Sequence, residues 1–314
     1  MMLSLPKPGV ILTHESDLDG FVSGLLLQRL ALKVFGEKPP LEAFHNHMWR
    51  QRRMVEGAAW VSDMSFERRL DRPCWMVVDH HPTDQTATQA LLIHDTTKSA
   101  GLIAYELCQE HGIRSDALDR LVHLNDIADL FTTTDPDFEL ASDYANLIKN
   151  YQFWNIYELV GGDLERLLDH PLVEVMAVKR RVENPLGYEY SRTHVVPISE
   201  EIGYVESVVG NVNWIVHQLL ERGETPYPVL LSLVRKSNNL IIASLRSRNG
   251  EAIKIASKLH GGGHPNACGA TLPRGVQSIP DALDYLRKLF ATTPCVESGL
   301  EIEDLERAFL AARK

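Results

Sequence analysis

The stretch WMVVDHHP, residues 75–82, decides the fold of this chain. Four apolar residues, two of them β-branched, predict a fully buried strand. The polar triplet Asp79-His80-His81 follows at its C-terminal end, where open α/β sheets bind their ligands. One carboxylate and two imidazoles at that edge suit Mn²⁺, Zn²⁺ or Fe²⁺. A strand-to-loop exit with two solvated histidines is the alternative that this stretch alone leaves open.

A second acidic segment follows the first predicted strand, residues 9–13 (GVILT). His14, Asp17 and Asp19 lie in the turn after this strand, and an apolar helical stripe begins at Phe21. Two carboxylates that converge in one turn suit a hard divalent cation, whereas phosphate would call for a glycine-rich loop with a lysine. Capping of the helix by Asp17 or Asp19 is the structural alternative.

A third strand, predicted at residues 58–64, places Asp63 in the same position as Asp17 and Asp79. The carboxyl ends of parallel strands meet at one sheet edge, so these acids are expected close enough to hold two ions ~3.5–4 Å apart. Further along, Asp126 and Asp129 are three residues apart and share one face of a helical turn. Either acid could complete a metal site.

Helices are expected at residues 99–111 and 118–124 and again between about residues 142 and 183, and Asn184–Gly187 is the best candidate for a connecting turn. The core residues expected in the last helical region are Trp154, Leu159, Leu164, Leu167, Leu168, Val173 and Val175.

A second unit is expected from about residue 193. Its pattern predicts a helix at about 204–221, strands at 228–234 and 240–245, and a helix at 252–259. The glycines Gly261, Gly262 and Gly263 then permit close backbone approach, so their amides could cradle an anion, with His264 and Arg246 as further donors. A flexible loop without function is the alternative.

Composition narrows the class of protein. A chain of 314 residues with 44% hydrophobic residues favours two domains. The net charge of −10 excludes a surface that attracts long nucleic acid as a whole. Four widely spaced cysteines indicate free thiols in a reducing compartment. The first residues carry no signal-peptide pattern and no segment approaches the ~18 apolar residues of a membrane span, so we expect a cytoplasmic protein without membrane contact. Residues 301–314 predict a charged amphipathic helix packed on the second domain.

The ordered set of these motifs resembles the DHH phosphoesterase superfamily, in the branch with an appended DHHA1 domain. The resemblance covers nearly the whole chain, and it rests on the whole set rather than on any one motif. The residues that carry it are His14-x-x-Asp17-x-Asp19-Gly20, Asp63, Asp79-His80-His81, Asp129, and Gly261-Gly262-Gly263-His264 with Ala267 and Gly269.

The resemblance implies two divalent ions, usually Mn²⁺, in the first domain. One ion would be held by His14, Asp17 and Asp63, and the other by Asp19, Asp63, His80 and Asp129, so that Asp63 bridges. Asp79 and His81 would support the site, with His81 facing the scissile phosphate. The second domain would grip the substrate through Arg246, Gly261, Gly262, Gly263 and His264.

Three features depart from the family pattern. Ser16 stands where a proline often precedes the first aspartate, and Glu15 is an additional acid without an assigned role. Cys268 replaces a usual alanine, which a small buried residue should tolerate. Asp129 is the preferred fourth acid, since residues 127–130 resemble the corresponding segment of RecJ-type members, and Asp126 remains the alternative.

The architecture expected is α/β: a mainly parallel sheet with helices on both faces in residues 1–188, and a smaller α/β domain in residues 189–314. A hinge near residues 184–195 and an active-site cleft between the domains complete this expectation. The hypothesis for function is two-metal hydrolysis, in which a water or hydroxide between the ions attacks phosphorus in line.

Short single-stranded RNA or DNA, or dinucleotides, are the expected substrates, because long duplexes need a broad basic track. Dephosphorylation of a nucleoside 3′,5′-bisphosphate is a further activity to consider. A RecJ-like single-strand exonuclease, a cyclic dinucleotide phosphodiesterase, and a catalytically silent binding protein of the same fold are the alternatives. The silent protein would lack metal ligands, and none of the expected ligands is missing. A homodimer is one option for the assembly.

Overall fold

The computed structural model describes residues 3–206, 208–236 and 239–291. The chain divides into two compact units, one formed by residues 1–189 with 208–215 and the other by residues 190–207 with 216–314. Each unit has its own sheet and its own hydrophobic core.

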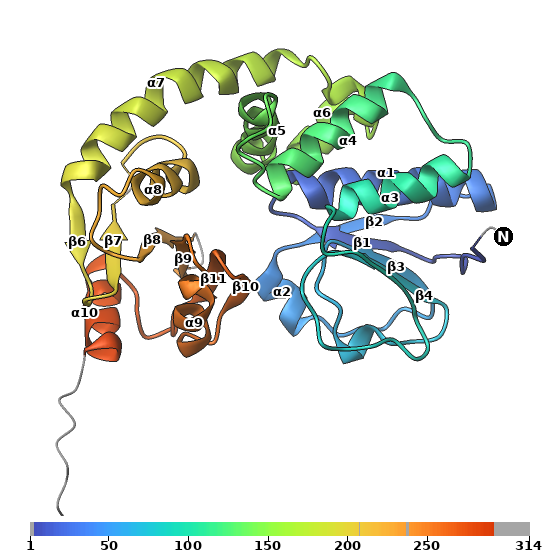
Figure 1. The fold of residues 1–314 in the computed structure, drawn as a ribbon. Helices are drawn as coiled ribbons and strands as arrows, with labels where there is room; N and C mark the ends of the chain where they lie inside the picture. Colours follow the sequence, from blue (N-terminus) through green and yellow to red (C-terminus); the bar gives the residue numbers. More distant parts are fainter. Residues whose placement is uncertain (1–2, 207, 237–238, 292–314) are drawn as a thin grey trace, which may run out of the picture. The chain divides into compact units, whose positions relative to one another are not determined.

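The first unit is built on a five-stranded sheet in which every pairing is parallel (Figure 1). Its spatial order is β2-β1-β3-β4-β5, with bounds β1 (Ile11–His14), β2 (Leu41–Phe44), β3 (Ala59–Ser62), β4 (Trp75–Asp79) and β5 (Leu91–His94). This sheet confirms the expected α/β class. Sequence pattern missed β5, whose four residues are all only half-buried because the strand lies at the edge of the sheet.

Side chains of β4 alternate between two cores, one on each face of the sheet. Met76 and Val78 pack with the core that includes the long helices α1 (Leu18–Phe35) and α3 (Ala100–Glu110). Trp75 and Val77 pack on the other face, beneath a cover supplied by the short helix α2 (Asn46–Gln51) and the 3-10 turn η1 (Arg68–Leu70). The strand is therefore fully buried, as its unbroken apolar sequence predicts.

The remaining helices of this unit follow in order along the chain. Their bounds are α4 (Asp116–Asp129), α5 (Phe138–Tyr151), α6 (Phe153–Val160), η2 (Leu164–Leu167) and α7 (Pro171–Thr193). Of the expected core residues, Leu164, Leu167 and Val173 are buried and Leu168 is partly buried.

Trp154, Leu159 and Val175 were wrong as core residues, because 37%, 50% and 48% of their surfaces are exposed. Helix α6 is only eight residues long and buries Phe153, Ile156 and Val160 on one face, which leaves its other apolar residues outside.

The turn expected at Asn184–Gly187 is also wrong, because these residues lie inside α7. Pro185 removes one helical hydrogen bond, yet the helix continues because its neighbours make tertiary contacts. Asn184 Oδ1 accepts a 2.8 Å hydrogen bond from the Asn211 amide. A Cβ atom at Gly187 would lie 2.1 Å from the Val209 carbonyl oxygen, so the glycine serves close packing rather than a turn.

The second unit contains a six-stranded sheet in the order β10-β11-β9-β8-β7-β6. Its strands are β6 (Val195–Pro197), β7 (Ile202–Val205), β8 (Val229–Arg235), β9 (Ile241–Ser247), β10 (Gly262–His264) and β11 (Ala267–Thr271). Only β7 and β8 pair in parallel among these described strands. The helix expected from Tyr204 was wrong at its start: Tyr204 lies in β7, and α8 runs over Val212–Glu221.

Two more helices, α9 (Glu251–Lys258) and α10 (Ile279–Phe290), contribute to the core of this unit. Sequence pattern anticipated α9 but not α10, which begins with a capping box between Ser278 and Asp281. The helix expected at residues 301–314 lies outside the described residues. None of the described helices combines the length and the apolar sequence that a membrane crossing requires.

Candidate metal centre

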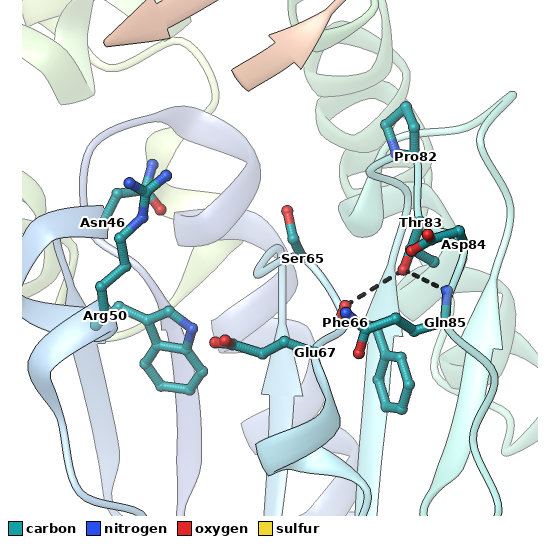
Figure 2. Close-up of a pocket in the computed structure, with 10 residues that line it drawn as sticks. Asn46, Arg50, Ser65, Phe66, Glu67, Pro82, Thr83, Asp84 and Gln85 are labelled. Atoms are coloured by element: carbon teal, nitrogen blue, oxygen red, sulfur yellow. Dashed lines mark hydrogen bonds between the residues drawn. The ribbon is translucent and has the colours of Figure 1, made fainter. Parts of the chain in front are cut away.

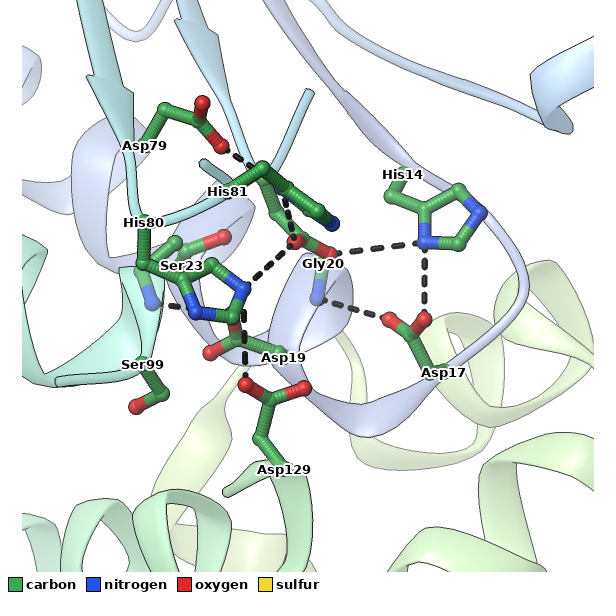
Figure 3. Close-up of polar contacts among 12 residues, drawn as sticks. His14, Asp17, Asp19, Gly20, Ser23, Asp79, His80, His81, Ser99 and Asp129 are labelled. Atoms are coloured by element: carbon green, nitrogen blue, oxygen red, sulfur yellow. Dashed lines mark hydrogen bonds and ion pairs between the residues drawn. The ribbon is translucent and has the colours of Figure 1, made fainter. Parts of the chain in front are cut away.

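Three neighbouring strands, β1, β3 and β4, end at the same edge of the first sheet, here called the rim. His14 ends β1, Asp63 follows β3, and His80 follows β4. Because the strands are parallel and adjacent, their carboxyl ends deliver these side chains to one place (Figure 3).

His14, Asp17 and Asp63 form the first group of candidate ligands. His14 Nδ1 lies 2.7 Å from Asp17 Oδ2 and 3.4 Å from Asp63 Oδ2. Asp17 is also the N-cap of α1, because its Oδ1 accepts a 3.1 Å hydrogen bond from the Gly20 amide. Capping and metal binding are therefore not exclusive, since the two functions use different oxygens of one carboxylate.

Asp19, His80 and Asp129 form the second group. His80 Nε2 lies 3.8 Å from Asp19 Oδ2 and 3.4 Å from Asp129 Oδ2. The same nitrogen lies 3.6 Å from Asp63 Oδ1. The two oxygens of Asp63 thus face different groups, Oδ2 the first and Oδ1 the second.

The backbone of Asp63 has a φ of 54°, in the left-handed region that non-glycine residues seldom adopt. Aspartate is among the residues that tolerate this conformation best. Its amide still donates to the Val78 carbonyl at 3.1 Å, so the chain turns sharply at the end of β3 without leaving the neighbouring strand.

Close packing of acids and histidines shifts their acidity. Burial and the neighbouring Asp63 charge raise the pKa of Asp19 to about 7. Burial opposes protonation of His80, but Asp63 and Asp19 outweigh it and raise the pKa of the imidazole to about 9. Burial and the charges of Asp19 and Asp63 also raise the pKa of Asp129 well above its usual range. Without a cation, protons must therefore balance the negative charge of the rim.

His14 and Asp63 shift in opposite directions for one reason. Burial works against the charged form of each, but their mutual contact outweighs it, with help from Asp17 for the histidine and His80 for the acid. The pKa of His14 is raised well above its ordinary value, and the pKa of Asp63 is held well below its usual range.

Divalent ions fit this donor set. His14 Nε2, Asp63 Oδ2 and Asp129 Oδ2 are buried and have no hydrogen-bond partner among the described residues. Such atoms are costly unless something else satisfies them. Mixed carboxylate and imidazole donors suit Mn²⁺ or Zn²⁺, and a cation would also replace the protons that the rim otherwise needs.

A supporting layer holds Asp19 in place, and the sequence analysis did not identify it. Asp19 accepts hydrogen bonds from the Ala100 amide at 2.9 Å and the Gly101 amide at 2.7 Å, at the N-terminus of α3. Asn125 Nδ2 donates to it at 2.6 Å. A Cβ atom at Gly101 would lie 2.5 Å from that nitrogen and 2.9 Å from Asp19 Oδ1, so only glycine fits.

Asp79 does not point at the two ligand groups. It accepts from the Phe66 amide at 3.2 Å through Oδ2, and its Oδ1 lies 2.8 Å from His81 Nδ1. The carboxylate therefore fixes the ring of His81 and the loop after β3. His81 is the most exposed histidine of the rim, at 29% of its side chain, compared with 11% for His14 and 2% for His80.

Two alternatives from the sequence are also placed. Asp126 accepts a 2.8 Å hydrogen bond from the Ser99 amide, whereas Asp129 lies beside His80. Glu15 lies 3.7 Å from His45 Nε2, outside both ligand groups.

A further cluster of His123, Asp135 and Asp137 lies away from the rim residues in sequence. Arg120 pairs with both oxygens of Asp137, and the His123 side chain is 51% exposed. A built-in guanidinium already neutralises this acid, so the cluster offers a cation less than the rim does.

The glycine motif of the second unit is a hairpin rather than an open loop. Gly262 and Gly263 lie in β10 and pair with Gly269 and Cys268 of β11. The Gly261 amide donates to the Ala256 carbonyl at the end of α9. The expected free cradle of three amides was therefore wrong, because these glycines also serve strand pairing and a helix end.

Arg246 and His264 lie on neighbouring parts of the same sheet. Arg246 is in β9, directly opposite Ala267 of β11, and His264 pairs with Ala267 from the other side. Both side chains are half-buried. Residue His217 of α8, which the sequence did not single out, is close enough for the Arg246 charge to lower its pKa, although burial is the larger cause.

Comparisons with known proteins agree with these observations. Residues 209–292 match the family model of the DHHA1 domain. No curated protein matches the sequence.

Two solved structures share the fold along most of the chain. A pGpG-specific phosphodiesterase, PggH from Vibrio cholerae, is 15% identical with a TM-score of 0.53, over 89% of this chain and 96% of that one. The DHH domain of a protein described as a member of a ribosomal protein family is 14% identical with a TM-score of 0.55, over 90% and 86% of the two chains. By its DHHA1 match and this shared fold, the chain belongs to the DHH–DHHA1 phosphoesterase superfamily.

Proposed function

We propose that the protein hydrolyses phosphodiester bonds of short oligonucleotides with two divalent metal ions, Mn²⁺ being the expected ion. The family assignment supports the coarser part, a metal-dependent phosphoesterase. One observation carries the two-ion proposal: the oxygens of Asp63 face two different groups of ligands, 3.4 Å from His14 and 3.6 Å from His80.

The rim residues would hold the ions in two sets that share Asp63. His14 and Asp17 complete one set, and Asp19, His80 and Asp129 complete the other. Bound divalent ions supply hydroxide near neutral pH and stabilise negative charge on phosphoryl oxygens.

Neighbouring residues of the chain would orient the substrate. Asp79 holds the ring of His81 at 2.8 Å, and His81 is the rim histidine with the largest exposed surface. We therefore assign His81 to contact with a phosphate oxygen, which it can stabilise as a hydrogen-bond donor. Burial opposes the charged form of His81, but Asp79 and Asp63 raise its pKa, and this favours the donor form.

The second unit would hold the far end of the substrate. We assign this role to Arg246, His264 and residues 261–263 of the DHHA1 domain, which together offer a guanidinium, an imidazole and backbone amides. A net charge of −10 favours a short substrate over a long one. The similar PggH is described as acting on pGpG, a dinucleotide, and this supports the same size class here.

Related substrates remain in the same proposal as ranked alternatives. A nucleoside 3′,5′-bisphosphate has the same phosphate chemistry as a short oligonucleotide, and a cyclic dinucleotide comes next. A RecJ-like exonuclease would need an aromatic and basic channel for a strand. A silent binding protein would lack ligands, and all six expected rim ligands are present.

Product analysis tests the proposal directly. We would incubate the protein with 5′-labelled RNA and DNA of two to about twenty-four nucleotides, with cyclic di-adenylate, and with adenosine 3′,5′-bisphosphate, in Mn²⁺ and in chelator. We expect fast cleavage that is confined to the shortest oligomers and requires Mn²⁺. Processive loss of long single-stranded DNA would favour the exonuclease, and no hydrolysis of any substrate would favour the silent binding protein.

A cytoplasmic homodimer is the assembly that we propose. Three cysteines in the described part of the chain are free thiols, as a reducing compartment allows. Helix α7 exposes an apolar stripe with the 3-4-4 spacing of a helix–helix seam, formed by Val175, Val178, Val182 and Leu186. The variant Val178→Glu/Val182→Glu should elute as a monomer in size-exclusion chromatography with light scattering, and a wild-type monomer would contradict the proposal.

A further inference from the structure

The first unit contains a cavity of about 650 Å³ beside the rim (Figure 2). Its volume lies within the ~300–1,000 Å³ range of small-molecule sites. Ten residues line it, drawn from α2 and from the loops after β3 and β4: Asn46, Trp49, Arg50, Ser65, Phe66, Glu67, Pro82, Thr83, Asp84 and Gln85. All ten belong to the first unit, so the cavity is complete without residues of the second.

Hydrogen bonds connect the cavity to the rim. Asp79 accepts from the amide of Phe66, a cavity residue, and contacts His81 through its other oxygen. On the opposite wall, His45 precedes α2 and its Nδ1 lies 2.8 Å from the Ser16 hydroxyl, next to Asp17. A group bound in the cavity would thus lie against the same loops that present the candidate metal ligands.

Donors and acceptors lie on opposite walls of the cavity. Arg50 and Asn46 lie on one side, and Asp84 and Gln85 lie across from them (Figure 2). The Arg50 guanidinium and the Asp84 carboxylate make no ion pair or hydrogen bond within the described ranges of the chain. Both side chains are exposed, so they are available to a ligand.

Trp49 adds an unsatisfied donor to the donor wall. Its side chain is 4% exposed, and its Nε1–H has no hydrogen-bond partner among the described residues. Phe44 packs against the indole, and Arg69 lies over its ring at 5.1 Å, so the ring is held firmly. A buried N–H without a partner favours a ligand that brings an acceptor to this wall.

We propose that this cavity binds a guanine base of the substrate, an inference that rests on the proposed function. Arg50 donates its paired N–H groups to O6 and N7 of the base, the most frequent specific contact of arginine with a base. Asp84 accepts from N1–H and the exocyclic amine on the opposite edge. Adenine fits less well, since its exocyclic amine places a donor where guanine offers O6 to the guanidinium.

The test compares three substrates in saturating Mn²⁺: pGpG, pApA, and pGpG built with 7-deazaguanine, which lacks the N7 acceptor. We expect wild-type kcat/KM to favour pGpG over pApA by about tenfold or more, from the ~1–3 kcal/mol of a bidentate base contact. The 7-deaza substrate should lose much of that preference.

Two variants assign the effect to the cavity. Arg50→Ala should reduce kcat/KM for pGpG to the level of pApA and should no longer distinguish 7-deazaguanine from guanine. Arg53→Ala is the matched control, because Arg53 is exposed on the same segment but does not line the cavity. Bis(p-nitrophenyl) phosphate has no base, so Arg50→Ala should leave its hydrolysis unchanged.

These measurements separate failure of the inference from failure of the proposed function. If wild type cleaves dinucleotides and Arg50→Ala behaves like Arg53→Ala on pGpG, the base site is wrong and the phosphodiesterase stands. If no substrate is cleaved, the proposed function fails, and calorimetry with guanosine monophosphate decides the base site alone. Weaker binding by Arg50→Ala than by Arg53→Ala would support the site, and equal affinities would overturn it.

Discussion

The rim of the first sheet and the glycine hairpin of the second unit use polar residues in opposite ways. At the rim, Asp19, Asp63 and His80 are almost completely buried and crowd together, so their pKa values shift strongly. In the hairpin, the backbone of Gly262 and Gly263 pairs with β11, and both residues keep some exposure. Rim side chains are held by a rigid frame, whereas hairpin glycines form the frame itself.

This difference teaches where substitutions should act. A change at the rim removes a charged group that the fold has already buried, so it should affect metal binding and activity first. A change in the hairpin introduces a side chain next to backbone atoms, so it should affect stability first.

The largest effect is expected for Asp63→Asn. Asparagine keeps the size of the side chain and tolerates the φ of 54°, but it cannot act as a bridging anion between the two ligand groups. We expect activity to fall further than the ~10–100-fold typical of lost supporting residues. Steady-state kinetics in Mn²⁺ would measure this, with circular dichroism to confirm the fold. Normal turnover with two bound ions would refute the bridging role.

A smaller effect is expected for Gly101→Ala. The new methyl group would displace Asn125 Nδ2 and Asp19 Oδ1, which lie 2.5 and 2.9 Å from its position. We expect Mn²⁺ affinity to fall by about 10–100-fold, as for other outer-shell changes. Gly57→Ala is the matched control, because nothing lies within 4 Å of its Cβ position. Equal Mn²⁺ affinities of the two variants by calorimetry would contradict the role given to Gly101.

Stability of the metal-free protein should depend on pH through the rim. The pKa of His80 is about 9 when folded and 6.5 for the free group, so its stabilising charge is complete below pH 6.5 and is lost as pH approaches 9. Asp19, with a raised pKa of about 7, also loses stability as pH rises toward that value.

We therefore expect the melting temperature in chelator to fall between pH 6.5 and 9. Mn²⁺ should remove much of this fall, because metal binding requires deprotonated ligands and strengthens as pH rises. A melting temperature in chelator that is flat or rising over this range would show that protons do not balance the rim charge.

The smallest effect on activity, but a clear effect on stability, is expected in the hairpin. A Cβ atom at Gly261 would lie 2.3 Å from the Gly269 carbonyl oxygen, whereas nothing lies within 4 Å of one at Gly262. Gly261→Ala should cost about 1–3 kcal/mol of unfolding free energy by overpacking. Gly262→Ala should stay within about 0.5 kcal/mol of wild type. Equal denaturant midpoints for the two variants would contradict the packing described here.

The sequence predicts the frame of the rim well, because strand ends leave a local signal. Buried apolar runs ended by Asp63 and Asp79 are visible in the chain, and the parallel pairing brings their ends together. The supporting residues Gly101 and Asn125 carry no such signal. They are 82 and 106 positions from Asp19, and only the folded packing of α3 and α4 against α1 reveals them.

Errors elsewhere have a common physical origin. Glycine and proline usually mark turns, but tertiary contacts can place them inside regular elements. Pro185 lies within α7, and Gly262 lies within β10. Apolar residues on short helices were also misplaced, since a helix such as α6 buries only one face. Local patterns therefore predicted element types better than the function of individual glycines.

The most direct test of the central claim, a two-ion centre that shares Asp63, is anomalous diffraction at the manganese edge from crystals grown with Mn²⁺. We predict two peaks, one among His14, Asp17 and Asp63, the other among Asp19, His80 and Asp129, with an oxygen of Asp63 bound to each. A single peak, or two peaks without Asp63 in common, would contradict the account.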